Sequence, residues 1–200
     1  MKITFLFLNI VCFLLVAGAT VPVLAGEPTE QIKQTTDKIL SVVKDPGLKI
    51  PSKAQERRRL IRKAADERFN WEEMARRSLG RYWAQRSAEE KKEFISLFSQ
   101  LVERTYMSQV ENYSGESVRY GKEAIDGDYA VVAVDILTQK NKGISVEYRL
   151  QKEGNEWLIY DVSIEGVSLV NNYRTQFNSI IQQSSYENLV KKMRAKVALE

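Results

Sequence analysis

The chain contains 200 residues, of which 44% are hydrophobic; its formal net charge is +4 at pH 7, and it has one cysteine and no histidine. Without histidine it cannot form a Ser-His-Asp triad, a Cys-His nucleophilic pair or an imidazole metal site. The small net charge gives no indication of a nucleic-acid partner.

Residues 1–25 predict a secretory signal peptide. The second residue is basic, residues 3–16 are almost uniformly apolar, and small residues precede an expected cleavage site after Ala25. Small residues and a proline interrupt the apolar run, which disfavours the alternative of a membrane anchor. We therefore expect an exported chain, residues 26–200, that folds as one domain without disulfides, because the only cysteine, Cys12, lies in the signal.

Four helices are expected in the first part of this domain. Ser52 and Asn70 are suitable N-caps for the second and third helices, and Ser87 with Glu90 forms a capping box before the fourth. The fourth carries a long apolar stripe at helical spacing. The expected ranges are 28–45, 53–69, 71–80 and 88–113.

The apolar period then changes to two, which is typical of strands. Short turns at 126–128, 140–143 and 154–155 separate the apolar segments, so we expect an antiparallel meander. The expected strands are 117–125, 129–137, 144–151 and 157–164. In the last strand, strict alternation predicts that one face carries Leu158, Tyr160, Val162 and Ile164.

Helical periodicity returns after Gly166 and continues, with a break at Ser184-Ser185, into a last amphipathic helix. The order of helices, four-stranded meander and helices predicts an α+β fold. We expect the four-stranded antiparallel sheet to curl around the flanking helices.

Carboxylates are the remaining candidates for acid-base chemistry. Asp126 and Asp128 flank a glycine and are best explained as turn residues. Asp161 and Glu165 lie four apart on one expected strand, but a paired-carboxylate hydrolase would also need a cleft and an oxyanion donor.

Basic residues concentrate between residues 57 and 86. Solvated helix faces explain them most simply. The alternative is a docking surface for an acidic partner or for phosphate head groups.

The many tyrosines and aliphatic residues allow two interpretations of the interior. One is a solid core, and the other is a hollow core with an apolar cavity, since tyrosine suits a boundary between apolar and wet surroundings. Spacing alone does not separate them.

Three segments closely resemble the MlaC family, also called the toluene-tolerance family, of periplasmic phospholipid-binding proteins. They are "LGRYWAQRSAEEKKEFISLFSQLVERTYMSQVENY" (79–113), "WLIYDV" (157–162) and "IEGVSLVNNYRTQF" (164–177). The resemblance covers nearly all of residues 26–200. The matching positions include Leu79, Gly80, Trp83, Phe94, Phe98, Tyr106, Tyr113, Trp157, Asp161, Glu165, Gly166, Val167, Ser168 and Phe177.

The resemblance implies an NTF2-like fold with a deep apolar pocket for acyl chains. It implies a monomeric periplasmic carrier, in a Gram-negative bacterium, that moves glycerophospholipid between an outer-membrane lipoprotein–porin complex and an inner-membrane ABC transporter. Such a carrier would maintain the lipid asymmetry of the outer membrane. No catalytic group, metal or other cofactor is expected.

From this resemblance we expect two sets of site residues. The head-group end of the pocket is expected at Asn171, Asn172 and Arg174. The expected pocket lining is Phe98, Tyr106, Val132, Val134, Tyr148, Leu150, Tyr160, Val162, Ile164, Val167, Leu169, Val170, Tyr173, Phe177 and Ile180.

Three alternatives remain at this point. Relatives with the same fold occur in hopanoid pathways, so a polycyclic triterpenoid is a rival ligand. An NTF2-like enzyme would use Asp161 or Asp135 as a base with a tyrosine as the acid. An exported interaction module with a filled core would contain neither ligand nor internal volume.

Overall fold

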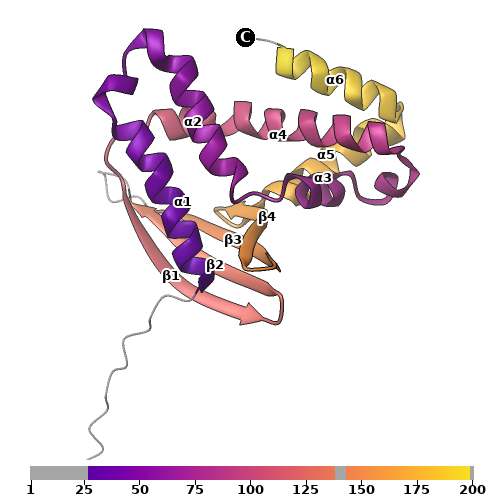
Figure 1. Cartoon of the computed structure of the whole chain (residues 1–200). Coiled ribbons are helices and arrows are strands. Elements are labelled where there is room, and N and C mark those ends of the chain that lie inside the picture. The colour runs from indigo at the N-terminus through magenta and orange to yellow at the C-terminus, as the bar shows by residue number, and fades with distance from the viewer. Residues whose placement is uncertain (1–26, 138–142, 199–200) are drawn as a thin grey trace, which may run out of the picture.

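A layer of helices lies against a strongly curved antiparallel sheet (Figure 1). The computed structural model describes residues 27–137 and 143–198. The predicted signal peptide and most of the predicted turn at 140–143 lie outside these residues. The helices are α1 (Glu27–Lys44), α2 (Ala54–Asp66), α3 (Trp71–Leu79), α4 (Ala88–Glu111), α5 (Leu169–Gln183) and α6 (Tyr186–Ala198). The strands are β1 (Ser117–Asp126), β2 (Tyr129–Leu137), β3 (Gly143–Glu153), β4 (Glu156–Ile164) and β5 (Val167–Ser168).

The helix starts follow the predicted caps in two of three cases. The Asn70 side chain accepts a hydrogen bond from the Glu73 amide at 2.9 Å, and Ser87 and Glu90 form the predicted capping box. The prediction for Ser52 was wrong, because this residue lies in a short 3-10 turn (Pro51–Lys53) and α2 begins at Ala54 without a side-chain cap. The positions of the other two helix starts agree with the prediction.

Among the described residues, no helix has the length and apolarity needed to cross a membrane.

The sheet has five strands in the order β1-β2-β3-β4-β5, so the prediction of four was wrong. The additional strand is only two residues long and pairs antiparallel with the end of β4. It forms because the chain reverses at Glu165 and Gly166, both of which have positive φ. Periodicity alone gives no signal for so short a strand.

A β-bulge in β4 changes which residues share a face. Arg149 pairs with Asp161 and Leu150 with Ile159, so Tyr160 is an extra residue without a partner on β3. The bulge shifts the alternation by one residue. The predicted face of β4 holds for Val162 and Ile164, which lie on one side after the bulge. It was wrong before the bulge, where Ile159 lies on that side and Tyr160 does not.

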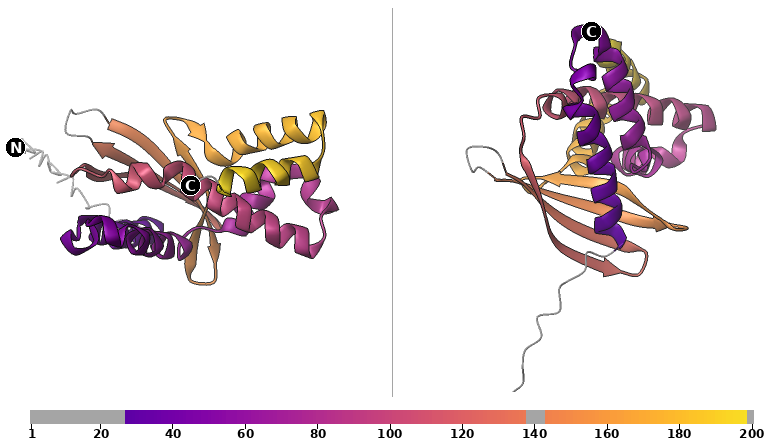
Figure 2. Two further views of the ribbon diagram at one scale, coloured as in Figure 1. Left: turned by 90° about the horizontal axis from the view of Figure 1, so that it is seen from above. Right: turned by 60° about the vertical axis from the view of Figure 1, so that its left-hand side comes forward.

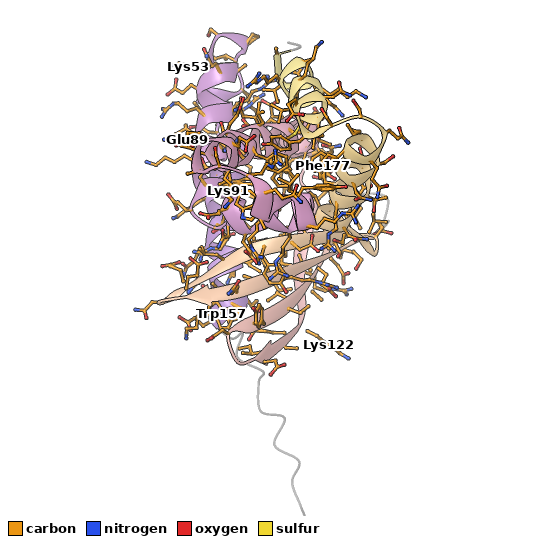
Figure 3. All side chains as sticks on the ribbon, turned by 90° about the vertical axis from the view of Figure 1, so that its right-hand side faces the viewer. Lys53, Glu89, Lys91, Lys122, Trp157 and Phe177 are labelled. Atoms are coloured by element: carbon orange, nitrogen blue, oxygen red, sulfur yellow. The ribbon has the colours of Figure 1, made fainter. Side chains whose placement is uncertain are left out.

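Among the described residues, buried apolar side chains form three cores, the smallest of which is Val43, Ile61 and Met107 from α1, α2 and α4. Helices α3, α4, α5 and α6 enclose one core, in which the Phe98 ring lies 5.4 Å from Tyr173 and 6.3 Å from Phe177, both edge to face. The inner face of the sheet forms another core, which includes Trp157 and is partly covered by α1. Figure 2 shows α1 crossing the strands, and Figure 3 shows Phe177 among the helices and Trp157 at the sheet.

Candidate functional site

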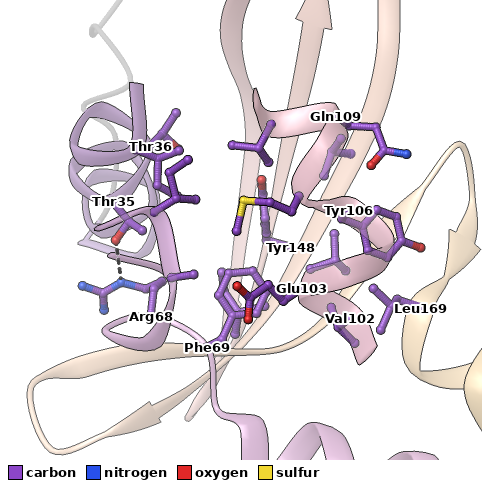
Figure 4. A pocket seen from close by; sticks show the side chains of 18 of the residues that line it. Thr35, Thr36, Arg68, Phe69, Val102, Glu103, Tyr106, Gln109, Tyr148 and Leu169 are labelled. Atoms are coloured by element: carbon purple, nitrogen blue, oxygen red, sulfur yellow. Dashed lines mark hydrogen bonds between the residues drawn. The ribbon is translucent and has the colours of Figure 1, made fainter. Parts of the chain in front are cut away.

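A cavity of about 320 Å³ lies between the inner face of the sheet and helices α1, α2 and α4 (Figure 4). It lies beside the solid helical core rather than within it. The walls are formed by the following residues: Ile32, Thr35, Thr36, Ile39, Ile61, Arg62, Ala65, Arg68, Phe69, Trp71, Val102, Glu103, Tyr106, Met107, Gln109, Val110, Ile136, Val146, Tyr148, Ile159, Val162, Ile164 and Leu169.

The apolar periods of the sequence explain why these walls are mostly greasy. On α1, residues 32, 35, 36 and 39 recur at helical spacing and therefore share one face. On β3, Val146 and Tyr148 alternate with exposed or half-buried polar residues. The bulge at Tyr160 then brings Ile159 and Val162 onto the same side as these β3 residues. The cavity can accept an apolar ligand because its surface offers few polar partners.

The Arg68 guanidinium is the most deeply buried charge in the cavity wall. Its Nη1 donates to Gln31 Oε1 at 2.5 Å, to Glu156 Oε2 at 2.8 Å and to the Trp157 carbonyl at 3.0 Å. Its Nε donates to Thr35 Oγ1 at 3.3 Å (Figure 4). These bonds occupy the charge and join α1, the end of α2 and β4, so Arg68 acts as a structural tie.

Partly exposed polar residues mark the edges where the cavity meets solvent. Arg62 pairs with Glu103 and with Asp66, each at 2.6 Å, and its guanidinium lies 5.2 Å from the Trp71 ring centre. Gln109 is an exposed lining residue on α4. The interior is therefore apolar, with polar groups at its borders.

The Tyr148 side chain projects from the sheet into the cavity (Figure 4). Its hydroxyl makes no hydrogen bond to any residue that the structure describes. Burial away from water, with a smaller contribution from Tyr120, raises the pKa of Tyr148 to about 12. The phenol is therefore neutral at physiological pH and able to donate a hydrogen bond.

We expect Tyr148 to contribute to a loss of stability at high pH. Because its folded-state pKa is about 12 and an ordinary tyrosine has pKa 10.0, the folded state keeps a proton that the unfolded state loses between these values. The contribution of neutral Tyr148 to the free energy of unfolding is fully present below about pH 10 and is lost as the pH rises towards 12. Urea unfolding of the wild type and Tyr148→Phe at pH 9 to 11 measures the effect. The phenylalanine variant should lose stability less steeply, and equal slopes would contradict the assignment.

The structure brings five of the predicted lining residues into this cavity: Tyr106, Tyr148, Val162, Ile164 and Leu169. Five others, Phe98, Val170, Tyr173, Phe177 and Ile180, pack in the helical core. Val132, Val134 and Leu150 lie in the sheet core without lining the cavity. Val167 is 60% exposed. Tyr160 faces a second cavity, and Val170 also borders it.

That second cavity, of about 340 Å³, also contains two of the residues predicted for the head-group end. Asn171 and Arg174 line it, whereas Asn172 lines neither cavity. The first and second cavities share no lining residue. The predicted neighbourhood of lining and head-group residues is therefore divided between two places.

Sequence reasoning missed the contributions of α1 and α2. Ile32, Ile39, Ile61 and Ala65 line the cavity, but their spacing fits any amphipathic helix that packs on a core. The sequence contains one weak signal for this contribution. The two early helices and the long α4 all carry apolar faces, and all of these faces need to pack against the same sheet. No spacing rule says that such faces leave a gap.

The carboxylates considered as catalytic bases do not line the first cavity. Asp161 accepts hydrogen bonds from the Val162 and Val170 amides and the Ser168 hydroxyl. Asp135 pairs with Arg119 at 2.7 Å on the surface. Within residues 27–137 and 143–198, no group of three or more acidic or cysteine side chains is placed to hold a metal.

Much of the basic segment is engaged in ion pairs. Arg57 and Arg58 both pair with Glu111, at 2.9 and 3.2 Å, and Arg62 pairs as described above. These contacts favour the interpretation as partly solvated helix faces. A docking surface here stays a prediction.

Comparisons with known proteins extend these observations. The family model described as "MlaC protein" matches residues 33–195. The intermembrane phospholipid transport system binding protein MlaC of Haemophilus influenzae is 26% identical over 171 residues, which cover 83% of this chain and 80% of that protein. A phospholipid-binding protein from Ralstonia solanacearum, solved in complex with a phospholipid, superposes with a TM-score of 0.78 at 25% identity, covering 86% of this chain and 98% of that one.

Proposed function

The chain belongs to the MlaC family, and from this premise we propose that it is a periplasmic carrier of glycerophospholipid. The proposal includes export by the signal at residues 1–25 and action as a monomer, with an NTF2-like fold. The name of the Haemophilus relative and the bound phospholipid of the Ralstonia protein support the ligand class.

The single observation that carries this proposal is the apolar cavity between the sheet and helices α1, α2 and α4. Transfer of an acyl chain from an apolar environment into water costs roughly 0.8 kcal/mol per methylene, so two chains of about 16 carbons cost on the order of 25 kcal/mol in total. A cavity lined by side chains such as Ile39, Met107 and Val162 offsets much of this penalty. The carrier needs no catalytic group for this task.

The volume of about 320 Å³ lies at the lower end of the range of roughly 300–1,000 Å³ for pockets that hold drug-sized ligands. A diacyl lipid is larger than such ligands. In the proposed lipid-bound form the walls therefore lie further apart than in the state described here. The head group would remain in water, near the polar edge formed by Arg62, Glu103 and Gln109.

We place the carrier between an outer-membrane lipoprotein–porin complex and an inner-membrane ABC transporter, where it would maintain outer-membrane lipid asymmetry. Family membership and the relative's description as part of an intermembrane transport system support this placement. Docking would use surface complementarity and no covalent chemistry.

Mass spectrometry of an organic extract tests the ligand class. The protein is purified without detergent from a Gram-negative host, and lipid is quantified per mole of protein. We expect stoichiometric diacyl glycerophospholipid. An extract without lipid would contradict the carrier function, and a polycyclic triterpenoid from protein purified from the native organism would replace the phospholipid by the rival ligand.

A further inference from the structure

The second cavity lies where α3 and α5 approach the outer face of β3 and β4. Three arginines from three different elements line it: Arg77 from α3, Arg149 from β3 and Arg174 from α5. The other lining residues are Tyr160, Asp161, Ser168, Val170 and Asn171. We call this the arginine cavity. Its polar lining makes it unsuitable for acyl chains, in contrast to the first cavity.

Each guanidinium is held by its Nε atom. Arg174 Nε donates to the Arg77 carbonyl at 3.0 Å, and Arg149 Nε donates to Glu147 Oε1 at 3.1 Å. Arg77 Nε donates to Glu73 Oε1 at 2.6 Å, and its guanidinium lies 4.2 Å from the ring centre of Tyr160. The terminal nitrogens of these three arginines make no hydrogen bond to the residues that the structure describes. Their donors are thus oriented but unused.

Both oxygens of the one carboxylate that lines the arginine cavity, Asp161, already accept hydrogen bonds. Asp161 is 5% exposed, and one of its oxygens accepts from the amides of Val162 and Val170 at 2.9 and 3.0 Å. The other oxygen accepts from the Ser168 hydroxyl at 2.6 Å. These bonds hold the β4–β5 reversal and the start of α5 in place. Asp161 therefore fixes the geometry of the wall and does not form an ion pair with any of the three arginines.

Two further carboxylates lie beside the cavity, and each bonds the Nε atom of one of its arginines. Hydrogen bonds, first from Arg76 and then from Arg77, lower the pKa of Glu73, so this carboxylate is charged and shared by two arginines. Glu147 contacts only the Nε of Arg149. Among the described residues, Arg174 forms no ion pair at all. The hydrogen bonds of the three arginines are thus made through Nε, and the terminal nitrogens make no hydrogen bond to a carboxylate among the described residues.

We propose that the arginine cavity binds a phosphate group. Guanidinium groups match the oxygens of a phosphate as bidentate donors, and three of them around a cavity can surround a tetrahedral anion. The Asn171 side chain lines the same cavity and adds an amide donor. The phosphate belongs either to a lipid head group at a membrane surface or to a small free phosphate compound. This proposal stands whether or not the first cavity carries lipid.

Titration with inorganic phosphate at constant ionic strength tests the site, with binding followed by isothermal calorimetry. Arg149→Gln and Arg174→Gln each remove one guanidinium, and we expect each to weaken binding about tenfold. Arg119→Gln is the matched control, because Arg119 is an exposed strand arginine with one acidic partner outside the cavity. Circular dichroism of each variant verifies folding.

The outcomes separate the site from general charge effects. Saturable phosphate binding that both cavity variants weaken and Arg119→Gln leaves intact supports the proposal. Absence of saturable binding, or equal weakening by Arg119→Gln, overturns it. Sedimentation with phosphatidylglycerol vesicles then identifies the source. A loss of vesicle binding in Arg149→Gln and Arg174→Gln but not in Arg119→Gln indicates a head group, and vesicle binding equal to wild type in both cavity variants indicates a free phosphate compound.

Discussion

Ala65→Trp should abolish most lipid binding while the protein remains folded. Ala65 lies on α2 and lines the first cavity, so an indole ring at this position occupies volume that an acyl chain would need. Because the indole enters space that is already present in the cavity, it causes less of the destabilisation that a larger side chain causes in a well-packed core. We expect co-purified lipid to fall roughly tenfold or more and the free energy of unfolding to change by about 1 kcal/mol or less, part of it from lower helix propensity.

Ala195→Trp is the matched control for this experiment. Ala195 is exposed on α6 and lines neither cavity. The same substitution there should leave the lipid content unchanged. Lipid quantified by mass spectrometry, with urea unfolding on the same samples, distinguishes blocked binding from misfolding. A folded Ala65→Trp protein with its full lipid content would exclude the first cavity as the binding site.

Phe98→Ala should lower the free energy of unfolding by about 3–5 kcal/mol. Phe98 is fully buried in the helical core and stacks with Phe94 while meeting Tyr173 and Phe177 edge to face. Removing the ring leaves a gap that the surrounding helices cannot close completely, so both burial and aromatic contacts are lost. Urea unfolding measures the change.

The same variant tests whether Phe98 is a residue of the packed helical core or a residue of the wall of a ligand cavity. If Phe98 supports only the helical core, lipid per mole of folded protein should remain at the wild-type level. Phe98→Leu keeps most of the volume and should cost about 1 kcal/mol. A small stability loss in Phe98→Ala combined with a large loss of lipid would instead return Phe98 to the cavity wall, as the resemblance implied.

The helices, most of their caps and most of the strands could be predicted from the sequence, because each depends on residues that are close together in the chain. The period of 3.6 around Phe98 and the period of two around Tyr148 identify the helix and strand that carry them. The capping box at Ser87 gives the helix start within one residue. Three quoted segments were also enough to indicate the MlaC family, to which the chain belongs.

Only the tertiary structure decided where these apolar faces meet and where they leave space. One extra residue in β4 turned Tyr160 away from the first cavity and put Ile159 beside Val162, and a bulge has no clear periodic signature. Phe98 packs solidly because four helices close around it, whereas Ile39 borders a cavity because α1 and α4 cross the sheet without filling the space between them. Both side chains are equally apolar in the sequence. Whether such a side chain fills a core or lines a cavity depends on the distance between packed elements, which no local pattern specifies.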